Sequence, residues 1–161
     1  MKYYIEKSEG HNLLKKILKE DYRIDNYELE YNEYGKPFLK NSNLFFSLSH
    51  SNLYSALVIC DREVGIDIEK IIYFDSIFKR YFNDEEKKFV NKSNNRDEAF
   101  TKIWTRKEAC LKRIGIGLNT NLKEVNGLDT SIVSYVYNDL IVSISKLWIC
   151  KFVNDVKQNN K

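Results

Sequence analysis

The chain has 161 residues, 43% hydrophobic and 30% charged, a balance typical of one globular domain or two small subdomains and not of a disordered segment. Its net charge of +3 is too small to imply nucleic-acid binding by itself. No apolar run approaches membrane-spanning length and the first residues form no signal-peptide stretch, so we expect a cytoplasmic protein without a membrane partner.

The first predicted elements are a helix and three strands. Leucine and isoleucine recur at helical spacing over residues 9–20, and residues 27–31 alternate like a strand before Gly35-Lys36-Pro37 breaks the chain. Residues 44–49 and 54–59 are apolar and are joined by a short polar connection, which predicts a hairpin.

A further strand is predicted over residues 64–68, directly after the hairpin. We therefore expect these strands to form a meander in a largely antiparallel sheet. Two helices follow, over residues 75–90 and 97–114. The end of the chain returns to strands, predicted at 131–136, 140–145 and 147–153. The sequence therefore predicts an α+β fold in which helices pack on antiparallel strands.

Two carboxylates share one face of the strand predicted over residues 64–68. Side chains alternate along a strand, so Ile66 and Ile68 face one way while Asp67 and Glu69 face the other. Two such carboxylates, about 7 Å apart, repel each other unless water or a cation intervenes. They form a plausible half-site for Mg²⁺, although an exposed strand edge with solvated charges gives the same pattern.

A third carboxylate lies on the apolar face of the second predicted helix. Phe100, Trp104, Glu108 and Leu111 share one face, so Glu108 falls on the stripe that should be buried, where a carboxylate is costly unless it is paired or bound to metal. Lys112 lies one turn later. The alternative is a surface Glu108–Lys112 ion pair, which contributes only about 0.3–0.5 kcal/mol.

Taken together, the three carboxylates and the lysine suit one kind of chemistry. A metal would neutralise a pyrophosphate, the lysine would support developing charge, and a carboxylate or its water would take a hydroxyl proton.

Ser49-His50-Ser51 offers a second polar motif. A serine–histidine hydrolase with Asp67 as third member is conceivable, but Ser49 and His50 point in opposite directions on an extended chain and there is no G-x-S-x-G elbow. His50 could instead bind a ligand phosphate, or simply cap the hairpin. His11, beside a helix start, is assigned no role.

In order along the chain, these pieces resemble the 4′-phosphopantetheinyl transferases, specifically the type that activates surfactin synthetase. The matching segments are Glu33-Tyr34-Gly35-Lys36-Pro37, Phe46-Ser47-Leu48-Ser49-His50-Ser51, Val64-Gly65-Ile66-Asp67-Ile68-Glu69, Phe82-Asn83-Asp84-Glu85-Glu86, and Trp104-Thr105-Arg106-Lys107-Glu108-Ala109-Cys110-Leu111-Lys112 leading into Gly115-Ile116-Gly117-Leu118. Each piece alone is weak, whereas the ordered set is specific.

The resemblance implies a catalytic centre. Asp67, Glu69 and Glu108 are similar to the family's Mg²⁺ ligands, with Mn²⁺ as an alternative ion. Glu108 is also the implied base, directly or through a metal-bound water. Lys112 resembles the lysine that contacts the coenzyme A phosphates and steadies the leaving group.

The resemblance also implies a coenzyme A site. Ser49 and His50 resemble the pair that holds the 3′-phosphate, and Lys36 and Pro37 resemble the segment lining the adenine site. Glu86 matches an acidic position of the family.

The implied fold has two similar α+β subdomains related by a pseudo-twofold axis, with coenzyme A between them. We expect a shortened N-terminal half at 1–62, a catalytic half at 63–153 and a tail at 154–161. The implied activity transfers 4′-phosphopantetheine from coenzyme A to a serine of an apo acyl or peptidyl carrier protein and releases 3′,5′-ADP. We expect a monomer or weak oligomer.

Three rival hypotheses remain at this point. A module of the same fold could bind coenzyme A or a carrier without turnover. A metal-dependent phosphohydrolase could use the same carboxylates. The smaller trimeric acyl-carrier-protein synthases form a third possibility, although the His50 and Lys36-Pro37 segments upstream of Asp67 argue against it.

Overall fold

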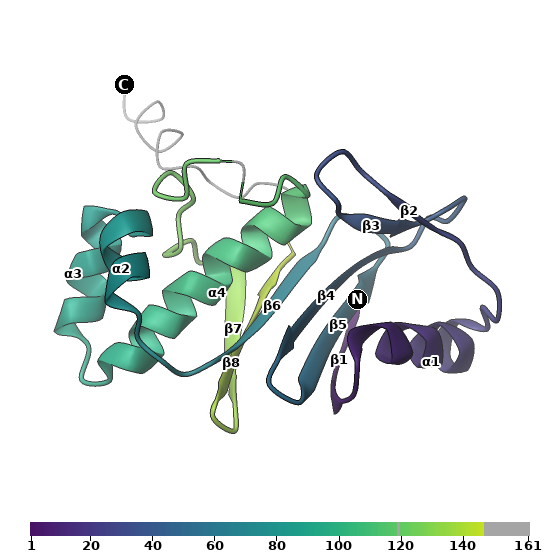
Figure 1. Cartoon of the computed structure of the whole chain (residues 1–161), viewed down its shortest axis with the longest axis horizontal. Helices are drawn as coiled ribbons and strands as arrows, with labels where there is room; N and C mark the ends of the chain where they lie inside the picture. The colour runs from purple at the N-terminus through teal and green to yellow at the C-terminus, as the bar shows by residue number, and fades with distance from the viewer. Residues whose placement is uncertain (119, 147–161) are drawn as a thin grey trace.

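The computed structural model describes residues 1–118 and 120–146 and confirms the α+β fold of antiparallel strands with packed helices (Figure 1). In chain order the elements are β1 (Lys2–Lys7), α1 (Gly10–Tyr22), β2 (Leu29–Tyr31), β3 (Pro37–Leu39), β4 (Phe45–Ser51), β5 (Tyr54–Cys60), β6 (Gly65–Lys70), α2 (Asp75–Tyr81), α3 (Asp84–Lys92), α4 (Arg96–Ile114), β7 (Ile132–Tyr137) and β8 (Leu140–Ser145).

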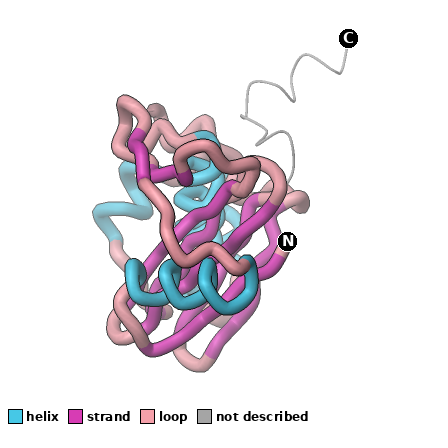
Figure 2. The backbone as a smooth tube through the Cα atoms, turned by 90° about the vertical axis from the view of Figure 1, so that its right-hand side faces the viewer, coloured by secondary structure: helices cyan, strands magenta, loops and turns pink. Residues whose placement is uncertain are grey.

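The first sheet has the strand order β1-β5-β4, with both pairs antiparallel. The apolar stripe of α1 packs on one face of this sheet, because its leucines and isoleucine recur every three or four residues. Figure 2 shows α1 lying across the strands. The small β2-β3 ribbon is a separate antiparallel pair.

The second sheet has the strand order β6-β8-β7, also antiparallel. The long helix α4 packs against β6 and β8. Gly65 permits this close approach, since a Cβ atom there would lie only 1.9 Å from the backbone oxygen of Ala109 in α4. The backbone of β6 is thereby held directly against the helix that carries Glu108 and Lys112.

The two sheets share one hydrophobic core. Apolar side chains of β5, β6 and β8 pack into a single buried cluster that crosses from one sheet to the other. At one edge β4 runs beside β6, and we call this junction the seam. The two strands belong to different sheets, so the seam lacks a backbone ladder.

The predicted meander is wrong in one respect, because β6 pairs with β8 and not with β5. The cause is β1, a strand that the sequence reasoning did not identify. β5 is the central strand of its sheet and pairs with β1 on one side and β4 on the other, so neither of its edges is open to β6.

The single helix predicted over residues 75–90 is also wrong, since α2 ends at Tyr81 and α3 begins at Asp84. Asn83 is the reason. Its side chain accepts a hydrogen bond from the Glu86 backbone N–H at 3.0 Å, and Glu86 Oε2 accepts one from the Asn83 backbone N–H at 2.9 Å. This capping box starts a new helix at a point where apolar periodicity continues.

Other predictions agree with the structure. The helix over 97–114 is α4, and the strands at 131–136 and 140–145 are β7 and β8, displaced by at most one residue at each end. The strand predicted at 147–153 and the tail at 154–161 lie outside the described residues. None of the helices in the described ranges combines the length and apolar character that a membrane crossing requires.

Candidate active site

The predicted alternation of β6 is confirmed. Ile66 and Ile68 are fully buried in the core shared by the two sheets, and Asp67 and Glu69 project from the other face. Asp67 is 2% exposed and Glu69 is half-buried. A solvated strand edge is therefore excluded for Asp67.

Asp67 forms a closed triangle with one residue of β4 and one of α4. Lys112 Nζ of α4 lies 2.7 Å from Asp67 Oδ1, Ser49 Oγ of β4 donates to the same oxygen at 2.8 Å, and Lys112 Nζ donates to Ser49 Oγ at 2.7 Å. The lysine thus bonds Asp67, and a surface Glu108–Lys112 pair is not what the structure shows. Asp67 Oδ2 is buried and finds no hydrogen-bond donor among the described residues.

The three acidic groups lie within electrostatic range of one another. Burial raises the pKa of Glu108 to about 7, with the charge of Asp67 as the next cause and that of Glu69 a smaller one, while Lys112 opposes them. Burial and the Asp67 charge also raise the pKa of Glu69. The pKa of Asp67 is raised by burial even though Lys112 and Ser49 both favour its ionised form. The site concentrates negative charge that a cation would stabilise.

The donors present fit a hard divalent cation. Asp67 keeps a buried carboxylate oxygen that has no partner within the described part of the chain, and Glu69 shares its face of β6. Within residues 1–118 and 120–146, no three histidine, cysteine, aspartate or glutamate side chains already surround one point as a ligand set. Mg²⁺ does not need such a set, because it typically takes one or two protein carboxylates and fills its shell with water and substrate phosphate.

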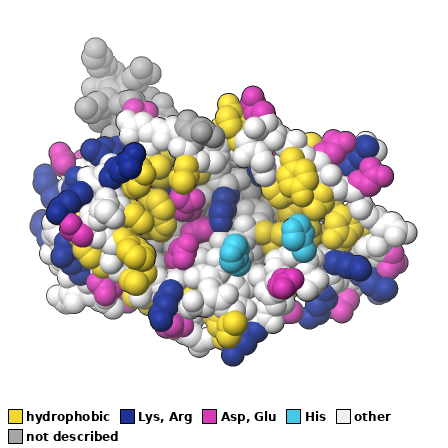
Figure 3. All heavy atoms as spheres, viewed as in Figure 1, with side chains coloured by type: hydrophobic (Ala, Val, Ile, Leu, Met, Phe, Trp, Pro, Cys, Tyr) yellow, Lys and Arg dark blue, Asp and Glu magenta, His cyan; other side chains and the backbone are white. Residues whose placement is uncertain are grey.

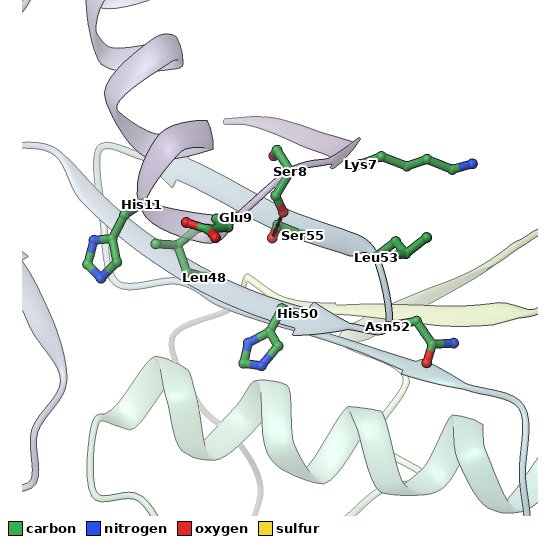
Figure 4. A pocket seen from close by; sticks show the side chains of 10 residues that line it. Lys7, Ser8, Glu9, His11, Leu48, His50, Asn52, Leu53 and Ser55 are labelled. Carbon is green, nitrogen blue, oxygen red and sulfur yellow. Dashed lines mark hydrogen bonds between the residues drawn. The ribbon is translucent and has the colours of Figure 1, made fainter.

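Ser49 and His50 do not converge on one site. The pleat of β4 turns Ser49 toward β6 and leaves His50 exposed on the other face. His50 lines a pocket of about 700 Å³ together with His11 and the start of α1. Figure 4 shows the two histidines on the same side of this pocket, from β4 and α1. The sequence reasoning assigned no role to His11, and only the fold brings it near His50.

The same face carries both parts of the site. Figure 3 shows acidic side chains beside a basic one in a hollow at the centre of the molecule, with both histidines of the chain close by. The acidic cluster and the two histidines therefore open onto the same face of the molecule.

Lys36 and Pro37 border a second pocket, of about 210 Å³. Residues 34–37 and 46–48 line one side, and Leu111, Lys112 and Gly117 line the other. The Lys36 ammonium is already engaged. It lies 2.5 Å from Glu63 Oε2 and donates to the Arg113 carbonyl at 2.7 Å, so it helps to close the last turn of α4.

Asn32 is a residue that the sequence reasoning missed. Its side-chain oxygen accepts hydrogen bonds from the backbone N–H groups of Tyr34 and Lys36, while its side-chain nitrogen donates to the Gly115 carbonyl at 2.7 Å. An asparagine three residues before Gly35 is a turn signal, but the contact with Gly115 spans 83 residues and no local pattern predicts it.

Glu86 is brought to Lys107 and not to Asp67. The two side chains are fully buried and form a 2.8 Å ion pair, and Lys107 also donates to the Leu122 and Val125 carbonyls. Gly127 N donates to the Glu86 carboxylate. This acidic position therefore anchors the segment after α4.

Comparisons with known proteins agree on one family. The family model described as "ACPS: 4′-phosphopantetheinyl transferase superfamily" matches residues 63–145, slightly more than half of the chain. The 4′-phosphopantetheinyl transferase gsp of Aneurinibacillus migulanus is 34% identical over 114 residues, covering 68% of this chain and 48% of that protein. The transferase psf-1 of Bacillus pumilus is 36% identical over 121 residues, covering 70% and 51%.

A third relative is the transferase Sfp of Bacillus subtilis (strain 168), which is 28% identical over 119 residues, covering 70% of this chain and 53% of that protein. The chain spans about half the length of these curated relatives.

Proposed function

The chain belongs to the 4′-phosphopantetheinyl transferase superfamily, and on this premise we propose that it transfers 4′-phosphopantetheine from coenzyme A to a serine of an apo acyl or peptidyl carrier protein. The observation that carries the proposal is the buried Asp67 carboxylate, which lies inside the region that matches the family. Lys112 bonds one of its oxygens, and the other has no hydrogen-bond partner among the described residues. We also propose the halves 1–62 and 63–153, a cytoplasmic location, and a monomeric or weakly associated state.

Coenzyme A would bind where the halves meet. The pocket bordered by Lys36, Pro37 and Lys112 suits the adenine end, because it combines apolar walls with a lysine at its inner edge. His50, in the larger pocket beside α1, suits a phosphate of the same ligand. Lys112 is the one of these residues that also touches Asp67, so it would join the nucleotide site to the acidic site.

Asp67, Glu69 and Glu108 would hold Mg²⁺, or Mn²⁺ in its place. Bound there, the ion would offset the negative charge of the diphosphate during the transfer. The Asp67 oxygen that lacks a partner among the described residues supports this assignment, as does the pKa of Glu108, which is raised by burial and by the neighbouring acids.

The transfer would be an in-line displacement at the pantetheine-side phosphorus. The carrier serine oxygen forms the new bond to phosphorus, the bond from phosphorus to 3′,5′-ADP breaks, and the serine proton passes to Glu108. A pKa of about 7 suits this role, because the carboxylate is available near neutral pH and still accepts a proton readily. Lys112 would steady the charge that develops on the departing phosphate.

The test is to mix the protein with apo carrier proteins, coenzyme A and Mg²⁺ and to weigh the carrier by mass spectrometry. We expect a gain of one phosphopantetheine, abolished in Asp67→Ala and kept in Asp25→Ala, whose side chain is mostly exposed in a surface ion pair. Coenzyme A binding without any mass gain would identify a non-catalytic module. Phosphate release without an acceptor would identify a hydrolase.

A further inference from the structure

Three serines of β4 meet β6 along the whole seam. Ser47, Ser49 and Ser51 alternate along the strand and are all buried, so their side chains share the face toward β6. We call them the serine ladder. Each serine side chain makes hydrogen bonds to different residues of β6, where two paired strands would have backbone hydrogen bonds.

The three serines make different hydrogen bonds. Ser47 Oγ accepts from the Ile66 backbone N–H at 3.1 Å and touches no carboxylate in the described contacts. Ser49 Oγ donates to Asp67 Oδ1 at 2.8 Å. Ser51 Oγ accepts from the Lys70 backbone N–H at 3.2 Å and donates to Glu69 Oε2 at 3.3 Å.

We propose that Ser49 and Ser51 are positioning residues that orient Asp67 and Glu69 toward a divalent cation. The inference rests on the proposed metal site and adds the side chains that aim its ligands. The first half would thus act on the metal site without supplying a ligand.

The hydrogen-bond geometry supports this role. Ser49 and Lys112 both donate to Asp67 Oδ1, so they fix the carboxylate plane and leave Oδ2 as the oxygen without a partner. A carboxylate that ligates a metal is usually held in this way by a hydrogen bond to a neighbouring side chain. Ser51 holds Glu69 by a longer bond on a less buried residue, so its effect should be weaker.

A purely structural reading is that the ladder only joins the sheets. Ser47 separates the two readings, because it belongs to the same ladder, has a similar burial and bonds β6 only through backbone. Loss of Ser47 and loss of Ser49 should therefore cost similar stability, while only Ser49 should change ion affinity.

The experiment titrates Mn²⁺ into the full chain and into Ser47→Ala, Ser49→Ala and Ser51→Ala, by calorimetry or by the Mn²⁺ electron paramagnetic resonance signal, with thermal melting of each protein alongside. We expect Ser49→Ala to bind Mn²⁺ about 10- to 100-fold more weakly, Ser51→Ala to lose less, and Ser47→Ala to keep the wild-type Kd. Ser49→Cys, of nearly the same size but a weaker donor, replaces Ser49→Ala if that variant does not fold.

Equal Mn²⁺ affinity in the Ser47 and Ser49 variants, with the wild type binding the ion, would overturn the positioning role alone. A wild-type protein that does not bind Mn²⁺ would overturn the proposed metal site as well.

Discussion

Glu108→Gln should stabilise the metal-free protein at alkaline pH. Burial and the neighbouring acids raise the pKa of Glu108 from its ordinary value of 4.5 to about 7, which means that its charge opposes folding. Glutamine keeps the shape of the side chain and removes that charge. The site would thus sacrifice stability for a carboxylate that can act near neutral pH.

The magnitude follows from the pKa. Between pH 4.5 and 7 the folded protein keeps a proton on Glu108 that the unfolded chain has released, so wild-type stability falls as the pH rises through this window. The difference of about 2.5 pH units, at 1.36 kcal/mol each, corresponds to about 3 kcal/mol. The glutamine variant has no such loss.

Urea unfolding in a chelator at pH 4, 6 and 8 measures the effect. We expect no difference between the variant and the wild type at pH 4, a partial gain at pH 6, and a gain of about 3 kcal/mol at pH 8. Added Mn²⁺ should then stabilise the wild type more than the variant. Equal free energies of unfolding at pH 8, or a gain that does not change with pH, would show that burial and the acidic pair do not raise the pKa of Glu108.

Three further variants test the scaffold. Lys107→Met leaves the buried Glu86 carboxylate without its cation and should cost about 3–5 kcal/mol in urea unfolding; a loss below 1 kcal/mol would contradict the buried pair. Gly65→Ala forces a Cβ atom into the backbone of α4 and should cost at least about 3 kcal/mol, so a wild-type urea midpoint would refute that close packing. Asn32→Ala removes the hydrogen bond to Gly115 and should lower the free energy of unfolding by about 1 kcal/mol. It should also raise the KM for coenzyme A more than it lowers kcat, and unchanged values would show that this hydrogen bond has no role.

Local patterns predicted the elements whose signal lies within the element. The helix α4 and the β7-β8 hairpin follow from periodicity and turn residues. The partner of β6 does not, because the pairing depends on β1 occupying one edge of β5, about 50 residues away in the sequence. The break at Asn83 was visible as a capping box, and the apolar periodicity that continues across it hid that signal.

The candidate site divides in the same way. Alternation on β6 predicted that Asp67 and Glu69 share a face. Helical spacing predicted a buried stripe through Trp104 and Glu108, but both are only partly buried, whereas Lys107 is fully buried. The bond between Lys112 and Asp67 depends on how α4 crosses β6, which the tight contact at Gly65 determines. Strand alternation also separated Ser49 from His50 in advance, although the family resemblance grouped them.

The region that matches the family model begins at residue 63 and contains the acids and Lys112, but not the strand that orients them. Ser49, the lining of the pocket around His50 and one side of the pocket at Lys36 come from residues before 63. The position of β4 relative to β6 is tied to the shared core, because β5, the partner of β4, packs its apolar face on β6 and β8. A substitution before residue 63 that shifts β4 would therefore change the hydrogen bond from Ser49 to Asp67 directly. For this reason substitutions on the β4 side of the seam, which lie outside the matched region, should change the acidic site as well.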